Sequence, residues 1–336
     1  MGGSLPARCP AGTRSNEALD SIELDAREHR GSDRGVEKLA APGLPAWLDS
    51  ELPFERYLVQ VEEHRMHVME TGRGRPVLML HGNPTWGYLW RHVVGRLKGE
   101  PLRLVMPDLI GLGLSDKPRD PGVHQLIQHG RWLGSLIRQM DLRDLILVVQ
   151  DWGGAIGLSA LLEQSERLAG LVLLNTVVGP PKPGIKPTLF HKFARFPGLS
   201  EIAFVGLGFP QVALGGAQGD RRSISGRVAK AYRWPLRMRA DRQAPLALAR
   251  MVPDSLQHPS IEPLERCQHL ATSFGGPTAI VWGDADPILG GVRTHMQRLF
   301  PDAPMTRTGA GHFLQEEVPD EIAAAICDVA QRLDSA

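Results

Sequence analysis

The sequence predicts an α/β fold in which a largely parallel sheet is covered by helices on both faces. From about residue 56 onward, short strand-like runs alternate with longer helix-like runs, and most of the strand-like runs are apolar at nearly every position. Continuous apolar runs are typical of strands buried on both faces, whereas half-exposed strands alternate apolar and polar residues. The alternation of strands and helices indicates βαβ units, which wind helices around both sides of a sheet.

The expected elements follow one another in a regular order. A hairpin is expected first, at 57–63 and 65–71, because apolar and polar residues alternate there. The apolar strands are expected at 76–82, 103–108, 145–151, 169–175 and 278–284. Helices are expected after most of these strands, at 86–98, 123–140, 153–164, 263–273, 291–300 and 320–334.

Two segments do not follow this alternation. Residues 1–36 mix Gly, Ser, Pro and charged residues without apolar periodicity, which predicts a flexible arm, and they lack the apolar stretch of a signal peptide. After the sixth expected strand the alternation stops for roughly 80 residues, which is too long for a loop. We expect a helical subdomain at 178–260, inserted into a core domain made of 37–177 and 261–336.

Composition excludes several classes of function. The chain has 336 residues, 38 Lys+Arg and 37 Asp+Glu, and this charge balance argues against nucleic acid or an anionic membrane surface as a partner. The longest apolar runs have about five residues, such as 145–149, which is too short for a membrane-spanning helix. Cys9, Cys267 and Cys327 are too scattered for a disulfide framework or a zinc site, which favours a cytoplasmic location.

The most specific local pattern is a buried strand that runs into Asp151 and then into Trp152 and two glycines. It has the form of a nucleophile elbow, in which the central residue adopts a strained turn and small neighbours allow the backbone to pack closely. Asp151 occupies the position where esterases carry Ser. Taken alone, the pattern also fits an aspartate that merely caps the following helix.

Further polar residues are expected at the ends of neighbouring strands. The sequence HGNPTW, at 81–86, comes at the end of the third strand. In this kind of fold, the loop at that point supplies one backbone N–H of an oxyanion hole, and the residue after the nucleophile supplies the other. The two donors expected here are the backbone N–H groups of Asn83 and Trp152. Asp284 and Asp286 follow the seventh strand. His312 belongs to the sequence GAGH at 309–312, which is expected to end an eighth strand. The chain order is therefore nucleophile, acid and base, which predicts a catalytic triad at the carboxyl edge of the sheet.

Four segments closely resemble the haloalkane dehalogenases of the α/β-hydrolase superfamily. They are HGNPTWGYLWR at 81–91, PDLIGLGLSDKP at 107–118, VVQDWGGAIGL at 148–158 and GHFLQEEVP at 311–319. The resemblance extends from about residue 45 to the last residue and is weak only in the inserted segment. It implies an α/β-hydrolase fold, with a mostly parallel central sheet flanked by helices and a helical cap inserted after the sixth strand.

The resemblance also implies roles for individual residues. In that family the aspartate of the QDWGG segment is the nucleophile, the tryptophan after it and the asparagine of HGNP hold the departing halide, and the histidine of GHF is the base. These positions fall on Asp151, Trp152, Asn83 and His312.

The triad acid requires a choice between positions. Some members carry it as Glu after the sixth strand, but this chain has Asn175 there. The family pattern G-x-x-D after the seventh strand selects Asp286, which leaves Asp284 as a turn or surface acid. An Asn/Trp halide pair combined with this acid resembles one of the family's subgroups.

The chemistry of a carboxylate nucleophile supports this interpretation. Attack of a carboxylate on an sp³ carbon leaves an ester that water can hydrolyse, whereas attack of a serine would leave an inert ether. Aspartate is ionised at neutral pH, so the first step needs no base, and His312 is needed only for hydrolysis of the ester. The expected reactants are a small halogenated aliphatic compound and water, with halide as a product. No cofactor is expected, and the sequence contains no metal-ligand cluster.

Other functions remain as alternatives. Related epoxide hydrolases use a pair of cap tyrosines to protonate the alkoxide, whereas this chain has only Tyr57, Tyr88 and Tyr232, one of them in the expected cap. Fluoroacetate dehalogenases carry Arg after the nucleophile, where this chain has Trp152. A luciferase of the coelenterazine type shares the HGNPT and DWG segments. A non-catalytic hydrolase fold that binds a small molecule is the alternative from another class.

Overall fold

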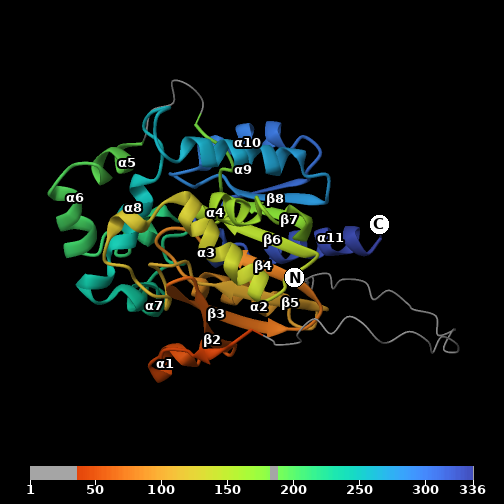
Figure 1. Cartoon of the computed structure of the whole chain (residues 1–336), viewed down its shortest axis with the longest axis horizontal. Coiled ribbons are helices and arrows are strands. Elements are labelled where there is room, and N and C mark those ends of the chain that lie inside the picture. The colour runs from red at the N-terminus through yellow and green to blue at the C-terminus, as the bar shows by residue number, and fades with distance from the viewer. Residues whose placement is uncertain (1–35, 182–187, 336) are drawn as a thin grey trace, which may run out of the picture.

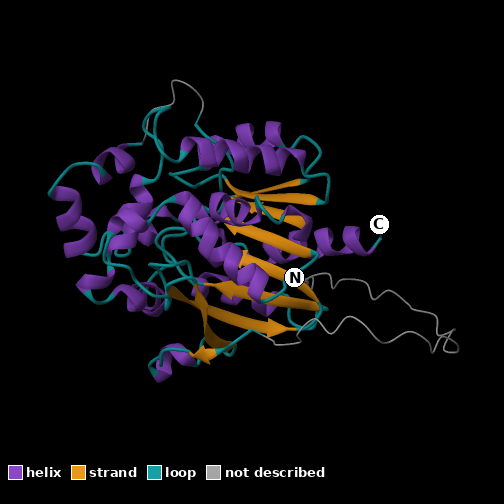
Figure 2. Cartoon of the chain, viewed as in Figure 1, coloured by secondary structure: helices purple, strands orange, loops and turns teal. Residues whose placement is uncertain are grey.

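The computed structural model describes residues 36–181 and 188–335, which form a mostly parallel sheet between two layers of helices (Figures 1 and 2). All of the expected arm at 1–36 except its last residue lies outside this described part. The strand order is β1-β2-β3-β5-β4-β6-β7-β8-β9. The strands are β1 (Leu39–Ala40), β2 (Glu55–Val61), β3 (His64–Gly72), β4 (Arg75–Leu80), β5 (Leu102–Pro107), β6 (Leu145–Gln150), β7 (Leu168–Leu174), β8 (Thr278–Gly283) and β9 (Met305–Thr308).

The sheet is antiparallel at one edge and parallel over the rest. β1, β2, β3 and β5 pair antiparallel, and every pairing from β5 to β9 is parallel. The expected hairpin is confirmed as β2 and β3, while the two-residue β1 was not predicted. β7 and β8 are the sixth and seventh strands of the sequence-based expectation.

The parallel strands are apolar throughout because each is covered on both faces. In β6, Leu145, Leu147 and Val149 pack into one hydrophobic cluster, whereas Ile146 and Val148 pack into the cluster on the opposite face. Successive side chains of a strand point to opposite faces, so a strand covered on both sides needs an apolar residue at every position.

Helices α3, α4, α9 and α10 cover one face of the sheet, and α2 and α11 cover the other. The expected helix at 86–98 is instead a 3-10 turn at Gly87–Trp90 followed by a short α2. None of the helices in the described residues is long and apolar enough to cross a membrane. The helices are α1 (Ala46–Asp49), α2 (Arg91–Arg96), α3 (Leu126–Gln139), α4 (Trp152–Leu161), α5 (Leu189–Ala194), α6 (Leu199–Glu201), α7 (Gly226–Arg233), α8 (Gln243–Arg250), α9 (Ile261–Ser273), α10 (Arg293–Leu299) and α11 (Pro319–Asp334).

Short helices separate β7 from β8, as the sequence predicts for the inserted segment. α5, α6, α7 and α8 gather at one end of the molecule, on the left of Figure 1. Phe204 lies at the centre of a small hydrophobic cluster there, together with Ala194, Leu246 and Ala249. The exact boundaries expected for this subdomain, 178 and 260, stay a prediction.

Candidate active site

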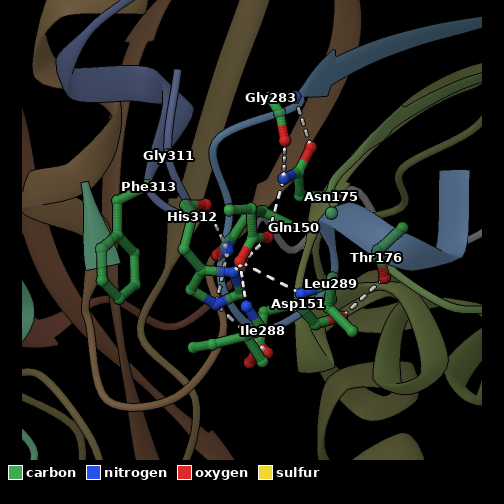
Figure 3. A network of polar contacts seen from close by, with 12 residues as sticks. Gln150, Asp151, Asn175, Thr176, Gly283, Ile288, Leu289, Gly311, His312 and Phe313 are labelled. Atoms are coloured by element: carbon green, nitrogen blue, oxygen red, sulfur yellow. Dashed lines mark hydrogen bonds and ion pairs between the residues drawn. The ribbon is translucent and has the colours of Figure 1, made fainter. Parts of the chain in front are cut away.

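Three loops at the carboxyl ends of parallel strands carry the predicted side chains. Asp151 directly follows β6, Asp286 follows β8, and His312 follows β9. Figure 3 shows Asp151 and His312 close together within a network of polar contacts. Residues that lie far apart in the sequence meet here because the carboxyl ends of parallel strands share one edge of the sheet.

Asp151 occupies a sharp turn between β6 and α4. Its φ of 51° and ψ of −129° are unfavourable for a residue that has a side chain. Close packing surrounds the turn, because a Cβ on Gly82 would lie 2.2 Å from Asp151 Oδ1 and a Cβ on Gly153 would lie 2.5 Å from the Leu80 carbonyl oxygen. Thr176 Oγ1 donates a hydrogen bond of 2.6 Å to the Asp151 carbonyl. The Asp151 carboxylate forms no capping hydrogen bond to α4, contrary to the capping alternative.

The two carboxylate oxygens of Asp151 have different neighbours. Oδ1 accepts a hydrogen bond of 2.8 Å from the backbone N–H of Asn83. Oδ2 lies 3.5 Å from Nε2 of His312. A backbone donor therefore holds one oxygen, and the other faces the imidazole.

His312 lies between two carboxylates and is almost completely buried. Its Nδ1 is 2.8 Å from Asp286 Oδ2. Burial by itself lowers the pKa of an imidazole, but here the charge of Asp286 and the hydrogen bonds to Asp151 and Asp286 outweigh burial and raise the pKa of His312 to about 10.

Asp286 is buried and fully hydrogen-bonded. Its Oδ1 accepts from the backbone N–H groups of Ile288 at 2.7 Å and Leu289 at 3.1 Å. Its Oδ2 accepts from Asn175 Nδ2 at 2.7 Å in addition to His312. Burial raises the pKa of Asp286, but the positive imidazolium and these donors offset burial and hold the pKa below its usual range.

Asp284, the other acid after β8, lies outside this network. Its carboxylate pairs with Arg293 and, at 2.7 Å, with Arg307. Of the two acids that the sequence offers, only Asp286 contacts His312 in the described structure.

A cavity of about 640 Å³ opens above Asp151 and His312. The indole of Trp152 lines it and forms no hydrogen bond with any residue in the described part of the chain. Asn83 lines it too, and its Nδ2 uses one N–H to bind the Pro245 carbonyl at 3.0 Å, which leaves a second N–H. Most other lining residues are apolar and come from both the core and the inserted helices, among them Val178, Phe190, Phe209, Leu214, Leu264 and Ile288.

Comparison with known proteins decides the family. Residues 75–319 match the family model described as the alpha/beta hydrolase fold. A haloalkane dehalogenase of Mycobacterium marinum is 31% identical over 78% of this chain and 87% of that protein. A haloalkane dehalogenase of Mycolicibacterium paratuberculosis is 32% identical over 80% of this chain and 88% of that protein. The chain belongs to the haloalkane dehalogenase family.

Solved structures of haloalkane dehalogenases share the fold. DatA from Agrobacterium tumefaciens C58 is 27% identical, with a TM-score of 0.73 over 83% of this chain and 97% of that one. DbeA from Bradyrhizobium elkani USDA94 is 24% identical, with a TM-score of 0.75 over 84% of this chain and all of that one, a similarity that shows the fold alone. The expected α/β-hydrolase fold is confirmed.

Two polar residues of this haloalkane dehalogenase-family site were not predicted to take part in it. From the sequence, Asn175 indicated only that this chain lacks a Glu after the sixth strand. In the structure, Nδ2 of Asn175 donates to Asp286 Oδ2 and to the Gly283 carbonyl, and Oδ1 of Asn175 accepts from the Gly283 N–H. Gln150 is buried beside His312 and contacts it twice. The available signal for Gln150 was a polar residue at the end of an otherwise apolar strand.

Tyr232, the tyrosine of the expected cap, is engaged elsewhere. It is buried on α7, its hydroxyl donates to Glu316, and it is not among the residues that line the cavity. Among the described residues, no group of three or more His, Cys, Asp or Glu side chains could hold a metal ion.

Proposed function

We propose that this protein is a haloalkane dehalogenase that hydrolyses halogenated alkanes to an alcohol, a halide and a proton. One observation carries the proposal: an aspartate in a strained elbow, 3.5 Å from a buried imidazole, lies beneath a largely apolar cavity. A serine in the elbow would favour acyl transfer, whereas a carboxylate favours alkyl transfer. An apolar cavity suits an uncharged alkyl substrate.

In the proposed first step, Oδ2 of Asp151 attacks the carbon that bears the halogen. A C–O bond forms, the carbon–halogen bond breaks, and the halide leaves with the bonding electron pair. Halide needs no proton but does need donors in a dry site, and the indole N–H of Trp152 and the free amide N–H of Asn83 can supply them. The product is an ester between the alkyl group and Asp151.

In the proposed second step, water attacks the carboxyl carbon of Asp151 while His312 Nε2 takes the proton. The backbone N–H of Asn83 already donates to Oδ1 of Asp151 at 2.8 Å. This group and the backbone N–H of Trp152 would stabilise the negative charge that develops on Oδ1. Collapse of the intermediate breaks the bond between the carboxyl carbon and the alkyl oxygen, and the hydroxyl proton of the intermediate passes to that oxygen. This releases the alcohol and restores the Asp151 carboxylate, and the proton taken by His312 then leaves to solvent. Asp286 would hold the imidazole and stabilise the imidazolium.

The charge of Asp151 links the two steps. In the free protein this carboxylate contributes to the raised pKa of His312. Esterification neutralises Asp151, so the pKa of His312 should fall at the moment when a neutral imidazole is needed. The first chemical step would therefore prepare the base for the second.

No particular contact in the described residues favours either epoxide hydrolysis or a non-catalytic receptor as the function. Opening of an epoxide needs an acid that protonates the alkoxide, and Tyr232 is buried against Glu316 rather than exposed to the cavity. A non-catalytic receptor would not need the coupled contacts of His312 with both Asp151 and Asp286.

The proposal also covers the organisation and location of the chain. We infer a core domain at 37–177 and 261–336, a cap at 178–260 and a cytoplasmic location. The widely spaced cysteines support this location, since disulfides are rare in the cytosol.

The direct test is halide release from brominated, iodinated and chlorinated alkanes of about two to six carbons. We expect bromides and iodides to react faster than chlorides, because the carbon–bromine and carbon–iodine bonds are weaker and those halides are better leaving groups. Asp151→Ala is the control, since it removes the nucleophile and should abolish release. If folded wild-type protein releases no halide from any of these compounds, the proposed function is wrong.

A further inference from the structure

Gln150 is the last residue of β6, a strand whose other five residues are apolar. Its side chain is fully buried, and Figure 3 shows it beside His312. The amide nitrogen Nε2 lies 3.1 Å from the His312 carbonyl oxygen and 3.3 Å from Nε2 of the imidazole. One buried amide therefore contacts both the backbone and the reactive nitrogen of His312.

The contact with the His312 carbonyl fixes the direction of the Gln150 amide. A carbonyl oxygen only accepts hydrogen bonds, so the group that faces it must be the NH₂ of Gln150 and not Oε1. Oε1 is buried and has no hydrogen-bond partner within the described residues. The second N–H of the NH₂ group is thus left for Nε2 of the imidazole.

A donor at Nε2 favours one form of the imidazole. Nδ1 of His312 faces the carboxylate of Asp286, which only accepts, so Nδ1 carries a proton. The neutral tautomer with its lone pair on Nε2 satisfies both contacts. The imidazolium would instead direct a second ring N–H at a site where Gln150 already presents an N–H.

We propose that Gln150 is a positioning residue that, once Asp151 has been esterified, favours the neutral tautomer of His312 with its lone pair on Nε2, ready to act as a base. The inference rests on the proposed function, because it concerns the step in which His312 accepts a proton from water. Gln150 is not among the residues that line the cavity, so it acts through His312 and not on the substrate.

The carboxylates around His312 act in the opposite direction. Asp286 and Asp151 both favour the imidazolium and raise the pKa of His312. His191 and His295 line the same cavity, and burial lowers the pKa of His191 to about 4, so His191 is neutral at pH 7. In the ester only Asp286 keeps its charge, so removal of the Gln150 donor should leave the effect of Asp286 on the pKa of His312 less opposed.

Gln164 provides a matched control. It is also a buried glutamine, and its Nε2 donates to the backbone carbonyls of Ala160 at 2.8 Å and Gly134 at 3.2 Å. It lies just beyond the end of α4, whereas Gln150 immediately precedes the turn that begins this helix. Replacement of either glutamine by methionine removes one buried amide and keeps a side chain of similar length.

The experiment follows bromide release from 1-bromobutane over time by wild type, Gln150→Met and Gln164→Met. The initial burst reports alkylation of Asp151, and the steady rate after it reports hydrolysis of the ester. We expect Gln150→Met to keep its burst rate within about twofold and to lose about tenfold in hydrolysis at pH 7. The acid limb of its hydrolysis profile should move up by about one pH unit, because loss of the donor raises the pKa of His312.

A second variant gives the test a larger signal. Gln150→Glu has nearly the same shape but presents an acceptor to Nε2, so it should stabilise the imidazolium and shift the acid limb further than Gln150→Met does. It also carries the test if the methionine variant does not fold. Gln164→Met should keep the wild-type profile even if it lowers the melting temperature.

The outcomes separate the inference from the function on which it rests. A profile of the Gln150 variants that coincides with the wild type, or an equal loss of hydrolysis at every pH, would overturn the role proposed for Gln150. Absence of bromide release by folded wild-type protein would contradict the proposed function instead.

Discussion

Asp151 and His312 differ in how much of the proposed reaction depends on them. Asp151 forms the covalent bond, and His312 enters only when water attacks the ester. The contact between His312 Nε2 and Asp151 Oδ2, at 3.5 Å, lets the imidazole reach a water molecule near the ester but is not needed for the displacement of halide. Variants of the two residues should therefore fail at different stages.

His312→Phe should release about one equivalent of halide and then stop. The ring fills the buried space of the imidazole but cannot accept a proton, so the ester should persist. Mass spectrometry of the intact chain should show the added alkyl group, and peptide analysis should locate it on Asp151. Steady turnover by this variant, or an adduct on another residue, would contradict the two-step mechanism.

Trp152→Phe should instead slow the halide burst itself. Loss of one of two donors to the leaving group should cost roughly 2–4 kcal/mol of transition-state stabilisation, by analogy with the loss of an oxyanion donor. Rapid-quench measurement of bromide release gives the rate of this step. Trp86→Phe is the control, because the Trp86 indole donates to the Ala231 carbonyl at 3.2 Å and lies outside the cavity lining. Equal bursts in the two variants would remove Trp152 from the proposed halide site.

At the scale of elements, the loop after β4 and the turn after β6 fit together without spare room. A Cβ on Gly82 would lie 2.2 Å from Asp151 Oδ1, the oxygen that the Asn83 N–H binds. Gly82→Ala should displace one of these two segments and reduce halide release by about 100-fold or more, because small displacements of reacting groups have large effects on rate. Steady-state halide release measures the effect.

Gly95→Ala is the counterpart on α2, where the new methyl group would meet nothing within 4 Å. It should raise stability by about 0.4–1 kcal/mol, since alanine restricts the unfolded chain, and leave activity unchanged. Similar activities of Gly82→Ala and Gly95→Ala would show that the close fit at Asp151 does not matter for catalysis.

The central strands were predictable because their burial leaves a direct signature in the sequence. β4, β6 and β8 are buried on both faces and are therefore apolar at nearly every position. The cap was predictable only as a helical insert. Its helices have three to eight residues, with 3-10 and π turns between them, so no sustained helical period could develop. At the expected helix start near residue 86, the Gly87 N–H binds Asp108, and a 3-10 turn forms instead.

The candidate site was predictable to the extent that it follows strand ends. Asp151, Asp286 and His312 could be found because a nucleophile, an acid and a base follow strands in a known order. Gln150 and Asn175 could not, because their side chains bind partners far along the chain: His312, 162 residues from Gln150, and Asp286 and Gly283, 111 and 108 residues from Asn175. Contacts between residues so far apart leave no periodic pattern or fixed spacing in the sequence from which they could be predicted.

At the scale of the whole molecule, the buried carboxylate of Glu316 joins one inserted helix, α7, to α2 and the turn before α11 in the core. Glu316, in the turn before α11, accepts hydrogen bonds from both terminal nitrogens of Arg91 on α2, at 2.5 and 2.8 Å. The hydroxyl of Tyr232 on α7 donates to the same carboxylate. The Arg91 guanidinium also lies 3.8 Å from the centre of the Tyr88 ring. One carboxylate therefore holds three segments that are distant in the sequence.

Glu316→Gln should lower the free energy of unfolding by about 3–5 kcal/mol, because it leaves the buried Arg91 without its counter-charge. Tyr232→Phe should cost less, about 1–2 kcal/mol, since only one hydrogen bond to the carboxylate is lost. Urea denaturation of each variant measures these changes. Asp320→Asn is the control: its ion pair with Arg96 also joins α2 to α11 but is about half exposed, so its loss should cost at most about 1 kcal/mol. If Glu316→Gln were no less stable than Asp320→Asn, the buried ion pair would contribute no more to stability than the exposed one.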